Sequence, residues 1–217
     1  MLRAQEAKRG VSASAVFIAR NRFAALSGHE PLVLLHAAIK ALAIALMKIG
    51  NDIRLMASGP HAGLGEIRLP ANEPGSSIMP GKVNPTQVEA LTMVCVQVMG
   101  HDVSIGIAAS QGQFELNVYQ PLIVHNTLDS LRLLTDAMDS FRRHCIEGIQ
   151  VNAAHAALVL SQSLMMATAL TPHIGYDRAA RIVAHAQSSG MTLRDAALAV
   201  GGVSPDEFDA WIAHGPN

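Results

Sequence analysis

Residues 31–56, PLVLLHAAIKALAIALMKIGNDIRLM, carry the strongest structural signal in this chain. Large apolar residues recur at alternating spacings of three and four, from Leu32 through Ile39 and Ile53 to Met56. A stripe sustained over more than three heptads predicts a long α-helix. The positions between are also largely apolar, and a helix that is apolar nearly all round is expected to be buried on several sides. We therefore expect residues 31–56 to lie in the core of a helical bundle.

The composition of the 217 residues favours an all-α fold. Half of them are hydrophobic, 15% are charged and 4% are aromatic. The apolar residues are mostly Ala, Leu, Ile, Val and Met, with little of the aromatic and Thr enrichment of sheets. The mean hydropathy of +0.26 requires either a membrane segment or a large apolar surface buried between subunits. His36, Lys40 and Lys48 interrupt the longest apolar stretch, so we expect no membrane span.

Charge, cysteines and histidines exclude several classes of function. A net charge of −1 gives no global attraction for nucleic acid. Cys95 and Cys145 have no metal-ligand spacing, and we expect two buried thiols in a reducing compartment. The ten histidines, among them His36, His101 and His125, lack carboxylates or cysteines at ligand spacing, so structural or surface roles are expected. No cofactor, no metal and no targeting segment are expected, and the location is cytoplasmic, or the mitochondrial matrix in a eukaryote.

The apolar spacing and the positions of helix-breaking and helix-capping residues predict the remaining helices and the domains. We expect a lead-in over residues 1–16, a partial central helical-bundle domain over 17–152 and a small C-terminal helical domain over 153–217. Pro121 should kink one long helix or mark its late start. Thr192 with Asp195, and Ser204 with Glu207, have the spacing of capping boxes. The expected helices after the first lie at about 85–108, 114–146, 153–171, 177–188, 193–200 and 205–213.

The stretch GSSIMPGKVNP, residues 75–85, is the strongest functional signal. Its glycines and prolines predict a loop. The loop brings together the hydroxyls of Ser76 and Ser77, the cation of Lys82 and the amide of Asn84. These groups could take a proton from a carbon next to a carboxylate and stabilise the resulting negative charge.

This loop resembles the signature of the fumarase/aspartase superfamily, and the resemblance extends from about residue 17 to residue 217. The finer match is to the class II fumarate hydratases, whose version of the loop looks like residues 81–87, GKVNPTQ. Further matches are LMKI at 46–49, NDIR at 51–54, ASGP at 57–60, NEPG at 72–75, FELN at 114–117 and HIGYD at 173–177. The resemblance implies an all-α fold, namely part of the family's central long-helix bundle followed by a small helical domain.

The resemblance also implies a reaction, the reversible hydration of fumarate to malate in the tricarboxylic acid cycle. On the family pattern, Ser76 takes the C3 proton of malate, and Ser77, Lys82, Val83 and Asn84 contact the substrate. Glu89 orients a histidine that handles the water proton. The implied partners are a small dicarboxylate and other copies of the chain, because family members are homotetramers whose active sites combine three subunits.

The chain also departs from the family pattern. It looks like the C-terminal half only, and the family's Thr-His, Ser-Ser-x-Thr and second carboxylate-binding motifs are not found in it. We therefore expect the isolated chain to have little or no hydratase activity. Two alternatives remain open. One is an aspartase-like or other fumarate-releasing lyase, which Gly81 and the Thr86–Gln87 pair disfavour. The other is a non-catalytic helical assembly protein derived from the family.

Overall fold

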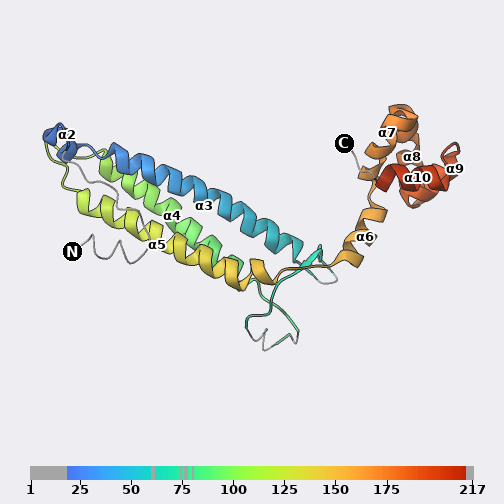
Figure 1. The fold of residues 1–217 in the computed structure, drawn as a ribbon, viewed down its shortest axis with the longest axis horizontal. Helices are drawn as coiled ribbons and strands as arrows, with labels where there is room; N and C mark the ends of the chain where they lie inside the picture. Colours follow the sequence, from blue (N-terminus) through green and yellow to red (C-terminus); the bar gives the residue numbers. More distant parts are fainter. Residues whose placement is uncertain (1–18, 60–61, 74, 76–77, 80, 214–217) are drawn as a thin grey trace. The chain divides into compact units, whose positions relative to one another are not determined.

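A computed structural model describes residues 19–59, 62–73, 75, 78–79, 81–213 of the chain (Figure 1). These residues form two compact units. The first unit contains residues up to Arg54 together with Pro70–Gly148, and the second contains Leu55–Leu69 together with the residues from Ile149 onwards. The expected boundary near residue 152 stays a prediction.

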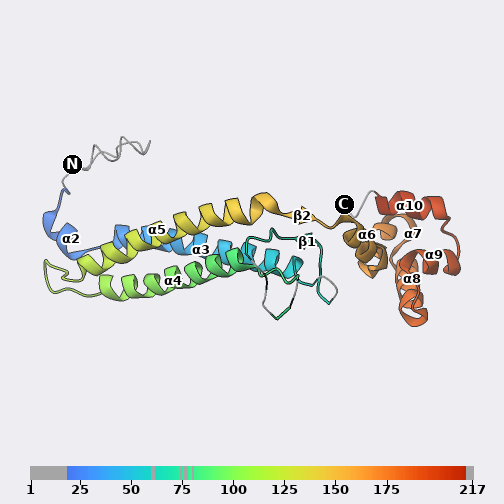
Figure 2. The ribbon, with the colours of Figure 1, turned by 90° about the horizontal axis from the view of Figure 1, so that it is seen from below.

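Three long helices, seen side by side in Figures 1 and 2, dominate the described part of the first unit. They are α3 (Glu30–Met56), α4 (Thr86–Ala109) and α5 (Gln120–His144). The short helix α2 (Arg22–Ser27) precedes them and the 3-10 turn η1 (Ile146–Gly148) follows. Each long helix runs antiparallel to the next along the chain, so the loop before α4 and the end of α5 lie at the same end of the bundle. The sequence predictions for α3 and α4 are confirmed.

The expected helix start at residue 114 is wrong, and the late start signalled by Pro121 is confirmed. Pro121 lies in the first turn of α5, where its missing N–H costs nothing. The preceding connection is fixed by Asn117, which is buried at 1% exposure. Its amide donates to the Ala108 carbonyl at 3.0 Å, and its side-chain oxygen accepts from the Tyr119 N–H at 2.8 Å. A segment held by these bonds cannot also form the first turns of a helix.

Within this chain α3 is buried along one face, not on several sides. Its buried residues are His36, Ile39, Ala43, Gly50 and Ile53. Other members of the predicted stripe are exposed: Leu35 by 45%, Leu42 by 43% and Ile49 by 47%. The apolar stripe is thus wider than the surface that the chain itself covers.

Within the described residues, two helices, α3 and α4, are long and apolar enough to cross a membrane, judged by length and composition alone. A third such span arises if α6 and the helical residues 164–174, which are bent by 68° at their junction, are counted together. We expected no membrane span, but the length and composition of these helices permit one. Whether they lie in a membrane or in a protein assembly depends on what covers their apolar faces.

The described part of the second unit is a set of short helices with its own core. A two-stranded antiparallel pair joins β1 (Ile67–Arg68) to β2 (Gln150–Val151). The core is formed by apolar residues such as Leu170, Ile182, Leu193 and Phe208. The helices are α6 (Ala153–Gln162), α7 (Ala167–Ile174), α8 (Tyr176–Ser189), α9 (Leu193–Val200) and α10 (Pro205–Ala213), with the 3-10 turn η2 (Leu164–Met166).

The cap predictions in this unit are confirmed. The Asp195 N–H donates to Thr192 Oγ at 3.1 Å. The Ser204 N–H donates to Glu207 Oε2 at 2.8 Å, and the Glu207 N–H donates to Ser204 Oγ at 3.3 Å. The expected single helix over 153–171 is wrong, because the chain is extended at Ser163 between α6 and η2.

Candidate functional site

The signature loop lies within the segment that connects Pro70 to α4, and side-chain hydrogen bonds attach the start of this segment to both neighbouring helices. The Asn72 amide donates to the carbonyl oxygen of His144, the last residue of α5, at 2.6 Å. Thr86, the first residue of α4, donates its hydroxyl to Glu73 Oε1 at 2.8 Å. The loop is therefore attached to the start of one bundle helix and to the end of another.

Close backbone contact narrows the loop at its base. A Cβ atom at Gly75 would overlap the carbonyl oxygen of Lys82. Gly81, the residue before Lys82, has a φ of 79°, a left-handed conformation that glycine adopts without strain. Both glycines of the motif are thus required by the backbone path that carries Lys82 back toward α4.

The predicted substrate-binding residues that the structure describes are consecutive and lie just before the start of α4. Lys82 and Val83 are exposed, and Asn84 is half-buried. Pro85 precedes the first helical residue. The free N–H groups and the dipole at the start of a long helix favour a negative charge, as does the Lys82 ammonium. Ser76 and Ser77, the predicted base and its neighbour, lie outside the described residues.

Glu89 projects from the first turn of α4, where its N–H bonds to the Pro85 carbonyl at 3.0 Å. Its carboxylate forms an ion pair with Arg54 in the last turn of α3, with 3.7 Å between Glu89 Oε1 and the guanidinium. Both side chains are partly exposed. Arg54 lies within the NDIR match, but the sequence pattern did not predict it as a site residue. The signal available in the sequence was the position of Arg54, four residues after Gly50 and therefore on the same face of the helix.

Gln87 belongs to the stretch that distinguishes the fumarase version of the loop, and it faces the bundle. Ser140 of α5 donates its hydroxyl to Gln87 Oε1 at 2.9 Å. One residue further on, Val88 is 1% exposed and packs in the core. Gln87 therefore joins α4 to α5 at the end of the bundle that carries the loop.

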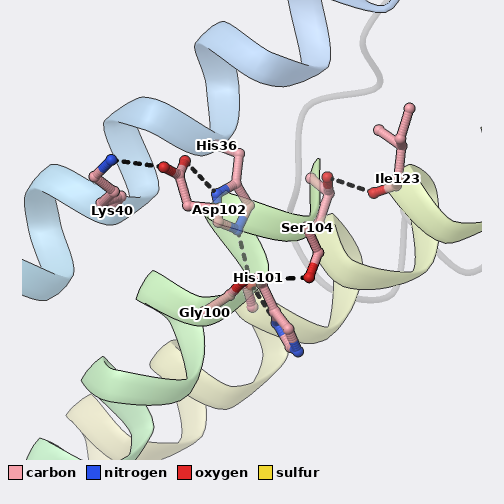
Figure 3. A network of polar contacts seen from close by, with 9 residues as sticks. His36, Lys40, Gly100, His101, Asp102, Ser104 and Ile123 are labelled. Carbon is pink, nitrogen blue, oxygen red and sulfur yellow. Dashed lines mark hydrogen bonds and ion pairs between the residues drawn. The ribbon is translucent and has the colours of Figure 1, made fainter. Parts of the chain in front are cut away.

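A second group of polar side chains lies inside the bundle (Figure 3). His36 of α3 is fully buried between Asp102 of α4, 3.1 Å from its Nδ1, and Ser130 of α5, 2.9 Å from its Nε2. Lys40 donates to the other oxygen of Asp102 at 2.6 Å. His101 Nδ1 lies 2.9 Å from the same Ser130 hydroxyl. Five side chains from three helices thus form one connected set.

One arrangement of protons satisfies every hydrogen bond of this set. A carboxylate only accepts, so His36 Nδ1 donates to Asp102, and His36 Nε2 accepts the Ser130 proton. Ser130 Oγ then accepts from His101 Nδ1. His101 Nε2 accepts from the amide of Gln97 at 2.8 Å. The hydrogen bonds therefore run in a single direction from α4 through α5 to α3 and back to α4.

The order carboxylate, imidazole, hydroxyl is that of a hydrolase triad, but the burial of these groups assigns them to packing. Ser130 and His36 are both 0% exposed, so no substrate atom can reach the hydroxyl. Asp102 lies sixteen residues along α4 from Thr86, about 24 Å at 1.5 Å per residue. The expected structural role of His36 is confirmed, and this set is separate from the signature loop.

Burial and hydrogen bonds shift the pKa values of several groups in the bundle. Desolvation lowers the pKa of His101, with His36 and His125 adding to the effect and Asp129 opposing it. For Asp102, desolvation pushes upward, but the hydrogen bonds from Lys40 and His36 outweigh it and lower the pKa. Cys95 and Cys145 are buried and free, as predicted, and desolvation raises the pKa of each thiol.

Comparison with known proteins finds two family models that match parts of this chain. Residues 4–100 match the family described as Lyase, and residues 166–214 match Fumarase C C-terminus. Over 194 residues, 89% of this chain, the sequence is 62% identical to a class II fumarate hydratase of Chromobacterium violaceum and 61% identical to one of Thermosynechococcus vestitus. The chain spans 42% of the length of each.

Solved structures agree with the sequence matches. A class II fumarase from Schistosoma mansoni superposes with a TM-score of 0.86 at 44% identity, covering 97% of this chain and 45% of that one. A fumarate lyase:delta crystallin from Brucella melitensis in its native form gives 0.83 at 40% identity, covering 97% and 46%. The fold is all-α, and the chain matches these two family models over separate parts of its length. Its sequence is similar to those of class II fumarate hydratases over less than half of their length.

Proposed function

We propose that this chain supplies the signature loop and part of the central bundle of a class II fumarate hydratase, which interconverts fumarate and malate. The observation that carries this proposal is the sequence identity of 62% to such an enzyme over 194 residues. The geometry supports it, because Asn72 and Glu73, just before the GSSIMPGKVNP loop, are hydrogen-bonded to the end of α5 and to the start of α4.

The chemistry needs what this loop offers. Removing the weakly acidic C3 proton of malate leaves a carbanion whose charge spreads into the adjacent carboxylate. Lys82, Asn84 and the N–H groups at the start of α4 would stabilise that charge. We assign proton removal to Ser76, with Ser77 and Val83 as further substrate contacts. A serine hydroxyl is a poor base at neutral pH, and a cationic loop favours its alkoxide.

Glu89 would orient the histidine that handles the water proton. That histidine belongs to a family segment that this sequence does not span, so we propose that activity requires that segment and an assembled oligomer. A homotetramer would also cover the exposed apolar faces of α3, α4 and α5. We therefore place α3 and α4 in a protein assembly in the cytoplasm and not in a membrane, with no nucleic-acid partner.

The test is hydration of fumarate by the chain alone and by the chain co-expressed with the segment of the Chromobacterium violaceum relative that it does not span. We expect turnover in the co-expressed assembly, little or none in the chain alone, and none in an assembly carrying Ser76→Ala. Turnover of aspartate in place of malate would support the aspartase-like alternative. An ordered assembly without either activity would support the non-catalytic one.

A further inference from the structure

Gly50 brings α3 close to the start of α4. A Cβ atom at Gly50 would lie 3.4 Å from Val88 and 3.5 Å from Thr92. Gly50 and Val88 are both buried, and Ile53 beside them is 8% exposed. The last two turns of α3 therefore pack directly on the first two turns of α4.

This packing determines what the last turn of α3 can reach. Residues four apart lie on the same side of a helix, so Arg54 extends the Gly50 face by one turn. On α4, Glu89 follows Val88 and lies in the turn that receives the signature loop. The observed distance of 3.7 Å from the guanidinium to Glu89 Oε1 follows from the contact of these two helices.

We propose that Arg54 is a positioning residue for Glu89 in the hydratase reaction, an inference that rests on the proposed function. Arg54 approaches one oxygen of the carboxylate, and the second oxygen stays available to the histidine that Glu89 would orient. A carboxylate only accepts hydrogen bonds, so this second oxygen would determine which nitrogen of a neighbouring imidazole carries the proton.

The location of the pair distinguishes it from the exposed ion pairs that lie within a single helix of the bundle. Lys48 with Asp52, and Arg143 with Asp139, join residues four apart on a single helix. Arg54 and Glu89 join two helices, and Glu89 carries a chemical role in the proposed reaction. An exposed pair adds little to stability, so its removal should affect turnover more than folding.

The experiment is a double-substitution cycle in the co-expressed assembly, with Arg54→Gln, Glu89→Gln and the combination. We expect Arg54→Gln to lower kcat roughly tenfold, a fraction of the 10²–10⁴-fold contribution of general acid–base groups, with KM changed much less. Arg54→Lys should recover part of the loss, because it restores charge but not the planar guanidinium. In the Glu89→Gln background, Arg54→Gln should change kcat by less than about twofold, since a residue that acts through Glu89 has no further effect once the carboxylate is gone.

Lys48→Gln, which removes an exposed ion pair from the same helix, is the matched control and should leave kcat unchanged. Losses that multiply in the double variant, or an unchanged kcat in Arg54→Gln, would overturn the positioning role alone. An unsubstituted assembly without hydratase turnover would instead overturn the proposed function, and this inference with it. Circular dichroism melts of each variant identify any loss that comes from unfolding.

Discussion

His36 Nε2 lies 2.9 Å from the hydroxyl oxygen of Ser130, which joins α3 to α5 through residues that are both fully buried. The hydroxyl is also 2.9 Å from His101 Nδ1. Ser130 is therefore the point at which the side chains of three helices meet.

We predict that Ser130→Ala destabilises the chain by about 1–3 kcal/mol, because it leaves two imidazole nitrogens in the bundle without their partner. Urea denaturation at neutral pH measures this loss. Ser104→Ala is the control, since its hydroxyl bonds only to the Gly100 carbonyl on its own helix at 3.3 Å, and it should stay within about 0.5 kcal/mol of the parent chain. Equal effects of the two substitutions would contradict the account of the polar set.

The pKa of His101 predicts how stability depends on pH. Its folded pKa lies below its ordinary value of 6.5, so the unfolded chain takes up the proton first as the pH falls. The stabilisation is then fully present above pH 6.5 and is lost progressively below it. The lowered pKa of Asp102 acts in the same direction, in the more acidic range below 3.8.

We therefore expect the unfolding free energy to fall as the pH decreases below 6.5 and His101→Asn to weaken this dependence, as charge linkage requires. The groups acting on His101 are His36 from α3 and Asp129 and His125 from α5. Asn keeps an amide donor but does not titrate. Denaturant titrations at several pH values check this. A steeper fall in His101→Asn would show that other groups control the acid response.

Two substitutions at Gly50 should change the stability of the chain in opposite directions. A methyl group there would make ordinary contact with Val88 and Thr92, so Gly50→Ala should stabilise the chain by up to about 1 kcal/mol through its higher helix propensity. Gly50→Leu has no such room and should destabilise it by about 1–3 kcal/mol. Thermal unfolding distinguishes the two, and equal effects of Ala and Leu would show that α3 does not approach α4 at this point.

The loop base supplies a prediction on activity. Gly75→Ala places a methyl group on the Lys82 carbonyl oxygen, so the loop must open and turnover in the co-expressed assembly should fall at least tenfold. Gly100→Ala meets no atom within 4 Å and serves as the control. Steady-state hydration of fumarate compares them. Full activity of Gly75→Ala would mean that the narrow base is not needed.

Periodicity was sufficient for the long helices but not for the contacts between them. The three-four stripe located α3, whereas it could not show that Leu35 and Leu42 would be exposed. The polar set joins residues 66 and 94 positions apart in sequence, and no local pattern encodes such pairings. The break at Ser163 was missed because neither Gly nor Pro marks it. In the loop, residue types indicated the chemistry, while the ion pair of Arg54 with Glu89 became visible only when α3 packed on α4.

The most direct test of the central claim is the exchange of malate hydrogens with solvent. When the co-expressed assembly is incubated with malate in deuterated water, proton NMR should show deuterium entering C3, because in the proposed reversible reaction the loop removes that proton. Ser76→Ala and Lys82→Ala assemblies should incorporate at least a hundredfold less, in line with the loss of a catalytic base or a charge-stabilising group. If both variants exchange the C3 hydrogen as fast as the unsubstituted assembly, the assignment of this loop to catalysis is contradicted.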